Sequence, residues 1–438
     1  MLRISIPRTP LLLAAALALA PHAAQAQPLS AAERRITAHV DAHVDEAVAL
    51  LERTVNINSG TGNARGVREV GRVFAAQLDS AGFQTRWVEL PDSLRRAGHL
   101  FAERRGTRGK RLLLIGHLDT VFEEDSPFQR YLRSGSTANG PGTSDMKGGN
   151  VVVVYALRAL EAAGALRDRR IVVAFTGDEE SPGRPLSISR AQLIEAGKNS
   201  DAALEFEGAS REEDGRETAV TSRRSSSGWT LRVTARSAHS SGIFAEGVGS
   251  GAIYEASRIL DAFRTQLRET GLTYNPGMIV GGTEAGFEAG ASRGTAFGKS
   301  NVIAGTAIVT GDIRTLTDEQ LQRTRERMRQ IVAQSLPQAR AEITFSEGYP
   351  SMPPTEGNLA LLATLNGVNR ALGYPTVEAN DPGRRGAGDI SFVAPYVSGL
   401  GGLGVHGAGS HTERETADLS TLAQQIKRAA LLIYRLTR

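Results

Sequence analysis

Two uninterrupted apolar runs, each followed at once by polar residues, constrain the fold of this chain more than any other feature. Leu112–Ile115 leads into Gly116-His117-Leu118-Asp119, and Ile171–Phe175 leads into Thr176-Gly177-Asp178-Glu179-Glu180. Apolar runs without alternation are typical of strands buried on both faces, as in parallel sheets covered by helices. In such sheets, ligands bind beyond the carboxyl ends of the strands. The two polar clusters therefore mark a candidate functional site.

The segments around these strands predict an α/β fold, with a mainly parallel sheet and helices on both faces. Apolar periodicity predicts helices over 31–54, 66–82 and 148–163 and strands over 84–89, 111–116 and 170–176. From about Ser222 the order changes to strand 229–236, helix 248–267, strand 304–315, helix 318–334 and strand 341–345. This order predicts a smaller, inserted α+β (ferredoxin-like) domain.

The chain then returns to the first domain, with helices over 358–372 and from 419 onward and a Gly-rich stretch over 399–409. We expect a first part of the main domain over 27–221, the inserted domain over 222–349 and a second part of the main domain over 350–438. The segment Gly281–Gly298 is rich in Gly and Ala and is interpreted as a loop between strands.

The N-terminus predicts export. Arg3 and Arg8 precede the apolar run Leu11–Ala20, and Ala24-Gln25-Ala26 fits a cleavage site. This is the pattern of a secretory signal peptide over residues 1–26, and the apolar run is too short to span a bilayer. We expect a secreted or periplasmic protein with no membrane anchor after cleavage. Without cysteine it has no disulfides.

The charge balance argues against a nucleic-acid partner. The chain has 51 Lys and Arg against 47 Asp and Glu, a formal charge of +4, and its basic residues are scattered among acids. A nucleic-acid-binding surface needs clustered positive charge.

Five short clusters offer histidine or carboxylate at predicted strand ends or in Gly-rich loops. Imidazole and carboxylate ligands without cysteine suit zinc, with cobalt or manganese possible. A loop aspartate can bridge two metals, because each of its oxygens can bind one. Within an adjacent acidic pair, one residue can bind metal while the other acts as a general base. The clusters are His117/Asp119, Asp145, Glu179/Glu180, Glu205/Glu207 and His406/His411. Strand geometry alone does not choose between Glu205 and Glu207.

Taken together, these clusters resemble the motifs of the M20 family of metallopeptidases, most closely its glutamate carboxypeptidase (carboxypeptidase G2-like) branch. The matching segments are 116–121 (GHLDTV), 140–149 (GPGTSDMKGG), 176–180 (TGDEE) and 409–412 (GSHT). The resemblance covers essentially the whole chain after residue 26.

The resemblance implies two zinc ions per chain, one held by His117, Asp145 and Glu207 and the other by Asp145, Glu180 and His411. It favours Glu207 over Glu205 and His411 over His406. Asp119 would orient His117, and Glu179 would take a proton from the attacking water and give it to the leaving amine. The bond before Met146 would be cis.

The resemblance also implies a homodimer joined through the inserted domain, which would serve as lid and dimerisation domain, with His239 reaching the partner's substrate. Substrate-binding residues would be Asn301, Arg314, Arg384, Gly386 and Gly388. Glutamate-releasing relatives have arginine where this chain has Tyr349. From that departure we expect release of neutral or aromatic C-terminal residues.

The predicted function is hydrolysis of a peptide or amide bond next to a C-terminal amino acid. Two alternatives use the same scaffold: a deacylase of N-acyl amino acids, or a dipeptidase. A third, from another class, is an inactive binding protein stabilised by metal.

Overall fold

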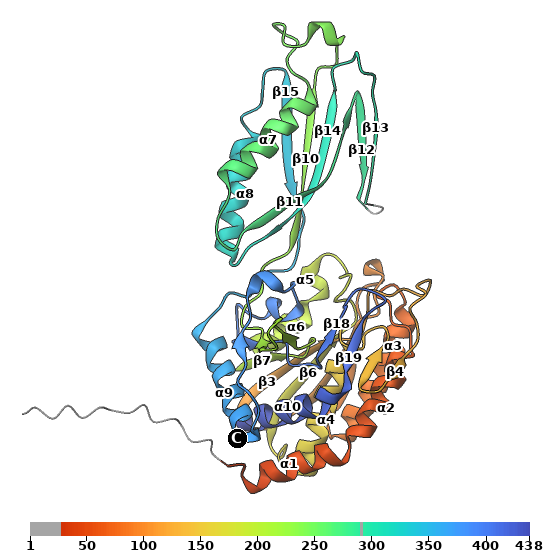
Figure 1. Cartoon of the computed structure of the whole chain (residues 1–438), viewed down its shortest axis with the longest axis vertical. Coiled ribbons are helices and arrows are strands. Elements are labelled where there is room, and N and C mark those ends of the chain that lie inside the picture. Colours follow the sequence, from red (N-terminus) through yellow and green to blue (C-terminus); the bar gives the residue numbers. More distant parts are fainter. Residues whose placement is uncertain (1–27, 290–291) are drawn as a thin grey trace, which may run out of the picture.

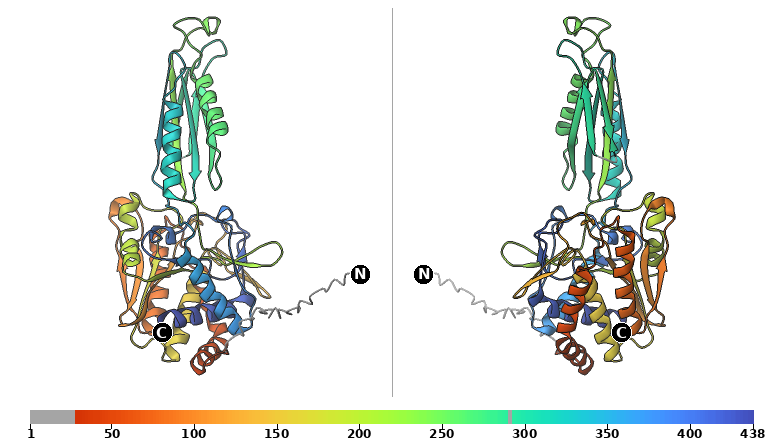
Figure 2. Two further views of the ribbon diagram at one scale, coloured as in Figure 1. Left: turned by 90° about the vertical axis from the view of Figure 1, so that its left-hand side faces the viewer. Right: turned by 90° about the vertical axis from the view of Figure 1, so that its right-hand side faces the viewer.

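The computed structural model describes residues 28–289 and 292–438, and it forms two units. Figure 1 shows the larger unit, here called the main domain, with the smaller inserted domain standing above it. Side views show that the connection between them is narrow (Figure 2). The predicted signal peptide lies outside the described residues. Within the part of the chain that is described, no helix combines the length and the apolar character needed to cross a membrane.

The main domain is built on a six-stranded mixed sheet in the order β1-β2-β6-β3-β7-β17. The pairs β6–β3, β3–β7 and β7–β17 are parallel, whereas β1–β2 and β2–β6 are antiparallel. The predicted α/β class with a mainly parallel sheet is therefore confirmed. The strands are β1 (Gln84–Val88), β2 (His99–Arg104), β3 (Arg108–His117), β6 (Arg169–Thr176), β7 (Ala202–Glu205) and β17 (Gly399–Leu400).

Alternate residues of the central strand β3 enter two different cores, because successive side chains of a strand point to opposite faces. Leu112 and Leu114 belong to the core under one set of helices, and Leu113 and Ile115 belong to the core on the other face. Helices on the first face are α1 (Ala31–Ala42), α2 (Val44–Val55), α3 (Ala64–Ser80), α4 (Lys147–Ala162), α9 (Glu356–Leu372) and α10 (Leu422–Thr437). On the other face lie α5 (Leu186–Ser189) and α6 (Ala191–Lys198).

The inserted domain has a four-stranded antiparallel sheet in the order β11-β14-β10-β15. Trp229, Leu231 and Val233 of β10 point toward α7 and α8, which cover one face of the sheet. The chain order is β10 (Ser227–Ala235), α7 (Ala252–Gln266), β11 (Thr273–Gly282), β14 (Thr306–Arg314), α8 (Asp318–Val332) and β15 (Ala339–Phe345). This order and pairing are those of a ferredoxin-like fold.

One predicted element was wrong, and another is divided in two. The segment Gly281–Gly298 is not a loop, because β12 (Glu284–Glu288) and β13 (Arg293–Phe297) form an antiparallel hairpin there. A Cβ on Gly294 would lie 2.6 Å from Val280 Cγ1, so this glycine allows the hairpin to pack directly on β11. The predicted helix 31–54 is divided at His43 into α1 and α2, and both halves pack against α4.

Two linker segments, residues 222–226 and 346–352, connect the domains and pair with each other. Arg223 exchanges two backbone hydrogen bonds with Met352, and Ser226 exchanges two with Tyr349. The predicted domain boundaries at 222 and 349 fall in these segments. The remaining strands form two small sheets of the main domain, β16 (Glu378–Ala379), β9 (Glu217–Ala219) and β8 (Ser210–Arg211), and β18 (Gly407–Ala408), β19 (Thr416–Asp418), β5 (Thr137–Asn139) and β4 (Leu132–Ser134).

Candidate metal centre

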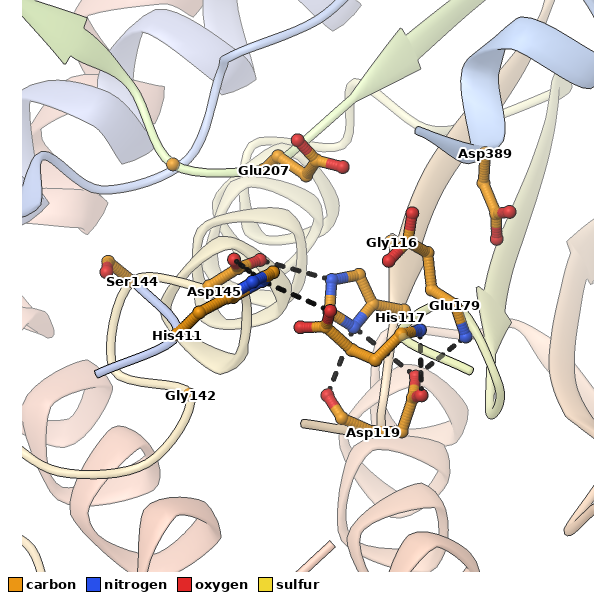
Figure 3. Close-up of polar contacts among 12 residues, drawn as sticks. Gly116, His117, Asp119, Gly142, Ser144, Asp145, Glu179, Glu207, Asp389 and His411 are labelled. Atoms are coloured by element: carbon orange, nitrogen blue, oxygen red, sulfur yellow. Dashed lines mark hydrogen bonds and ion pairs between the residues drawn. The ribbon is translucent and has the colours of Figure 1, made fainter. Parts of the chain in front are cut away.

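The parallel register brings the predicted site residues to one edge of the main sheet. His117 is the last residue of β3 and lies opposite Thr176, the last residue of β6. Glu205 ends β7 and lies opposite Ile115. Glu179, Glu180 and Glu207 follow these strand ends, as polar groups do in sheets of this kind. Asp145 comes from the loop before α4, and His411 from the loop between β18 and β19 (Figure 3).

Asp145 lies between two histidines and turns one oxygen toward each. Its Oδ1 lies 3.3 Å from His117 Nε2, and its Oδ2 lies 3.2 Å from His411 Nε2. His411 Nε2 is also 3.2 Å from Glu180 Oε2. Burial alone would raise the pKa of Asp145, but hydrogen bonds from His117 and His411 lower it strongly. Hydrogen bonds with Asp145 and Glu180 raise the pKa of His411 to about 11. The peptide bond between Asp145 and Met146 is cis, as predicted.

Asp119 is fully buried and connects His117 to the loop after β6. Its carboxylate lies 3.4 Å from His117 Nδ1, which leaves Nε2 directed at Asp145. The same carboxylate accepts hydrogen bonds from the backbone amides of Glu179 (3.0 Å) and Glu180 (3.1 Å) and from Thr61 Oγ1 (2.6 Å). Carboxylates that hold a ligating imidazole in this way fix its tautomer. Burial opposes the charge of Asp119, but the interaction with His117 and the hydrogen bonds from Thr61 and the Glu180 amide lower its pKa below the usual value.

Among the residues that the structure describes, two groups of potential ligands are compact enough for a metal ion. Asp145, Glu180 and His411 have ligand atoms within 4.8 Å of one another, and so do His117, Glu179 and Glu180. The first group is one of the two predicted ligand sets. The second shares only His117 with the other predicted set, which has Asp145 and Glu207 in place of Glu179 and Glu180. Burial, opposed by His117 and reinforced by nearby carboxylates, raises the pKa of Glu179 well above its usual value. Imidazoles and crowded carboxylates of this kind fit a pair of divalent cations.

Glu205 and Glu207 differ in exposure although both contact Arg223. Glu205 is fully buried, accepts a hydrogen bond from Arg223 Nη2 at 2.5 Å and accepts another from the amide of Ile390 at 3.1 Å. Glu207 lines the cavity at the sheet edge, and its Oε2 accepts from Arg223 and Arg385. The charge of Glu207 is thus balanced by two guanidinium groups, and its role as a metal ligand stays a prediction.

His406 and His411 also occupy different environments. His406 is buried, and its Nε2 lies 3.4 Å from Glu217 Oε1, away from the residues that line the cavity. His411 lines the cavity and faces Asp145 and Glu180.

Glu415 is a site residue that the sequence analysis missed. Its carboxylate accepts hydrogen bonds from the amides of Gly142 (3.2 Å), Ser144 (2.9 Å) and Asp145 (3.0 Å). It therefore shapes the loop that presents Asp145. Burial and the Asp145 charge raise its pKa to about 7. The one sequence signal was its position four residues after His411.

The predicted substrate-binding loop lies against the same site. A cavity of about 260 Å³ is lined by Arg384, Arg385 and Gly386 together with the metal-site residues. Arg384 Nη1 donates to Glu212 at 2.5 Å. Gly388 lies behind Glu207, where an added Cβ would be 2.9 Å from Glu207 Oε1. Gly386 and Arg384 thus face the cavity, whereas Gly388 permits the close packing behind it.

The predicted site residues of the inserted domain lie at its two ends. Arg314 ends β14 at the linker end, where Thr315 bonds to Ser225. His239 and Asn301 lie together at the other end, since Val302 forms a bridge with His239. The nine residues of β10 separate His239 from the linker segments, a length of about 30 Å. None of these three side chains lines the cavity.

Tyr349 does not occupy the position that the sequence argument gave it. Its hydroxyl donates to the carbonyl oxygen of Glu179 at 2.8 Å and accepts from Arg190 Nη2 at 3.0 Å. Its ring packs against Phe392, with centroids 4.9 Å apart. It is a partly buried neighbour of the Glu179 backbone and does not line the cavity.

Comparisons with known proteins find similar sequences and similar folds. The sequence model of peptidase family M20/M25/M40 matches residues 113–435. Carboxypeptidase G2 of Pseudomonas sp. (strain RS-16) is 29% identical over 419 residues, covering 92% of each chain. A tripeptidase from Staphylococcus aureus has a similar structure, with a TM-score of 0.69 and 17% identity over 90% of this chain and 99% of that one. A metallo-carboxypeptidase from Sulfolobus solfataricus has a TM-score of 0.64 and 15% identity over 89% and 98%.

Proposed function

Because the chain belongs to peptidase family M20/M25/M40 and is therefore a metallohydrolase, we propose that it is a two-zinc enzyme that cleaves the amide bond before a C-terminal amino acid. The observation that carries the proposal is the position of Asp145, whose two oxygens face two different histidines at 3.3 and 3.2 Å. A carboxylate in this position can bridge two ions while each histidine binds one.

Some residues of the site would bind the metal ions, and another would take part in the reaction. His117, Asp145, Glu180, Glu207 and His411 would hold the metals, and zinc would supply Lewis acidity that polarises the scissile carbonyl. Glu179 would accept a proton from the attacking water and pass it to the leaving amine. Its amide is bound to Asp119 and its carbonyl oxygen to Tyr349, so its backbone is fixed from both sides.

The distribution of the remaining site residues supports a homodimer as the active form. Strand β10, about 30 Å long, separates His239 from the linker segments. The histidine that reaches the substrate would therefore have to come from a second copy of the chain. The same outer part of the inserted domain exposes large apolar side chains, including Phe244, Tyr254 and Phe297. Exposed apolar surface of this kind is common where protein chains associate.

Export to the periplasm or the medium completes the proposal. It rests on the signal peptide predicted for residues 1–26. Fractionation of the producing cells and N-terminal sequencing of the product test it. Cleavage should leave a chain that begins near Gln27, and an intact Met1 terminus in the cytoplasm would contradict export.

A substrate panel at fixed zinc, with metal analysis of the same sample, tests the proposed activity. Peptides and N-acyl amino acids that differ only at the C-terminal residue should release that residue. Release from acylated amino acids alone would favour the deacylase alternative, and hydrolysis limited to dipeptides would favour a dipeptidase. No hydrolysis by a sample that holds two zinc ions would favour the inactive binding protein.

A further inference from the structure

The two linker segments each place one side chain beside the metal site, Arg223 fully buried and Tyr349 partly buried. Arg223 comes from the segment before the inserted domain and Tyr349 from the segment after it. The side chain of Arg223 is 1% exposed, and Tyr349 lies beneath the Glu179 loop. Four backbone hydrogen bonds join the two segments, so both side chains belong to one rigid connection.

Tyr349 fixes the loop that carries Glu179. Its hydroxyl bonds to the Glu179 carbonyl oxygen and to Arg190, which is fully buried and also bonds to Asp178 and Asp389. Two residues earlier, Glu347 Oε2 accepts from the amide of Leu186 at 2.9 Å. The loop after β6 is therefore tied to the linker at more than one point.

Arg223 acts in the same way on the other side of the site. Its Nη2 donates to both Glu205 and Glu207, and its Nη1 donates to the carbonyl oxygens of Gly386 (2.8 Å) and Ala387 (3.1 Å). A planar guanidinium can serve several acceptors in fixed directions, which an ammonium cannot. Arg223 thus sets the position of Glu207 relative to the loop that lines the cavity.

We propose that Tyr349 and Arg223 are positioning residues through which the linker holds Glu179 and Glu207 in place and couples them to the inserted domain. This inference rests on the proposed function, in which Glu179 moves the proton and Glu207 binds zinc. Tyr349 does not line the cavity, and the guanidinium of Arg223, which does, is held by four protein acceptors. A change at either one should therefore alter the site without removing a reacting group.

Tyr349→Phe tests the first contact, because it keeps the ring packing and removes only the hydroxyl. We expect kcat to fall about tenfold, KM to change less than about twofold, and both zinc ions to stay bound. Amide exchange at Glu179 and Glu180 should become about tenfold faster, because their loop opens more easily. Tyr274→Phe is the matched control. It removes a 2.7 Å hydrogen bond to the Phe263 carbonyl oxygen within the inserted domain and should change neither kcat nor exchange at these amides.

Arg223→Lys tests the second contact with a readout that does not depend on hydrolysis. Zinc affinity of one site should fall by about 10- to 100-fold, the usual effect of losing a partner that orients a ligand. Arg428→Lys is the control, since Arg428 is also buried and bonds to Glu217 and Asn369 outside the site. Zinc affinity unchanged in Arg223→Lys, or reduced equally in Arg428→Lys, would overturn the role of Arg223.

The exchange measurement separates this inference from the proposed activity. Faster exchange at Glu179 and Glu180 in Tyr349→Phe supports the positioning role even if the wild-type chain hydrolyses nothing in the panel. In that case only the proposed function fails. Exchange no faster than in Tyr274→Phe overturns the role of Tyr349, whatever the substrate.

Discussion

Replacement of the bridging carboxylate is the sharpest test of the two-metal centre. Asp145→Ala removes an oxygen that faces His117 and an oxygen that faces His411, so each metal loses a charged ligand at once. We expect about two zinc ions per chain in the wild type and none in the variant after gel filtration. Glu180→Ala, in contrast, removes a ligand assigned to one metal and should release one zinc ion.

The size of the effect follows from the contacts. Loss of a residue that only orients a ligand costs about 10- to 100-fold in metal affinity. Loss of the ligand itself should cost at least the upper value at each site, about 100-fold or 2.7 kcal/mol per ion. The loop should keep its shape, because Glu415 binds the amides of Gly142, Ser144 and Asp145, and alanine retains the amide.

Elemental analysis and competition with a chromophoric chelator measure this loss. Asp201→Ala is the control, because Asp201 pairs with Arg111 at the opposite edge of the sheet and should retain both metals. A thermal melt checks that the variant is folded. One zinc ion per wild-type chain, or two retained in folded Asp145→Ala, would refute the bridging geometry.

Three further predictions follow from the same structure. Glu179→Gln keeps the shape of the side chain but removes the base, so kcat should fall by a factor of about 10²–10⁴ while zinc stays bound. Loss of zinc from this variant would instead identify Glu179 as a metal ligand. Glu217→Gln should lower the free energy of unfolding by about 1–3 kcal/mol at pH 7 in urea titrations. Contacts with His406 and Arg428 outweigh burial and lower the Glu217 pKa. The contribution of Glu217 is therefore present above the unfolded pKa of about 4.3 and is lost as pH falls below that value. If the free energies of unfolding of the wild type and Glu217→Gln differ as much at pH 3 as at pH 7, this assignment is wrong. Mixing His239→Ala chains with Glu179→Gln chains should restore activity, and confirmed heterodimers without rescue would exclude action across a dimer.

Local patterns predicted the parts of the fold in which one signal dominates. The apolar runs of β3 and β6 predicted buried parallel strands, and the polar residues after them lie at the carboxyl edge of the sheet. The hairpin β12–β13 was missed because glycine is both a loop signal and a residue that permits close packing. At Gly294 the second role holds, since only a missing side chain lets the hairpin approach Val280.

Site residues were predictable where the residue type itself indicates the chemistry. They were not predictable where the role of a residue depends on its tertiary contacts. Histidine and carboxylate at strand ends indicated metal ligands. No sequence signal showed that Arg223 is buried between Glu205 and Glu207, because most arginines are exposed. Glu415 was likewise invisible as a support of Asp145, since its partners are backbone amides 270 to 273 residues earlier in the chain.

The structure changes the expected substrate specificity. The sequence placed Tyr349 in the substrate pocket, where the lack of a cation would disfavour a C-terminal glutamate. Its hydroxyl is instead hydrogen-bonded to Glu179 and Arg190. The identity of residue 349 therefore does not determine whether the charge of a substrate glutamate is paired. Arg385 lines the cavity but is engaged by Ser210, Gly208 and Glu207. Among the described residues, the Arg384 side chain is 57% exposed and pairs only with Glu212, which is 22% exposed. A pair near solvent is worth about 0–1 kcal/mol. Arg384 can therefore leave Glu212 and bind a substrate carboxylate at little cost in free energy. Of the cations that line the cavity, it is the one best suited to bind that carboxylate. The reason to expect discrimination against a C-terminal glutamate is thereby removed.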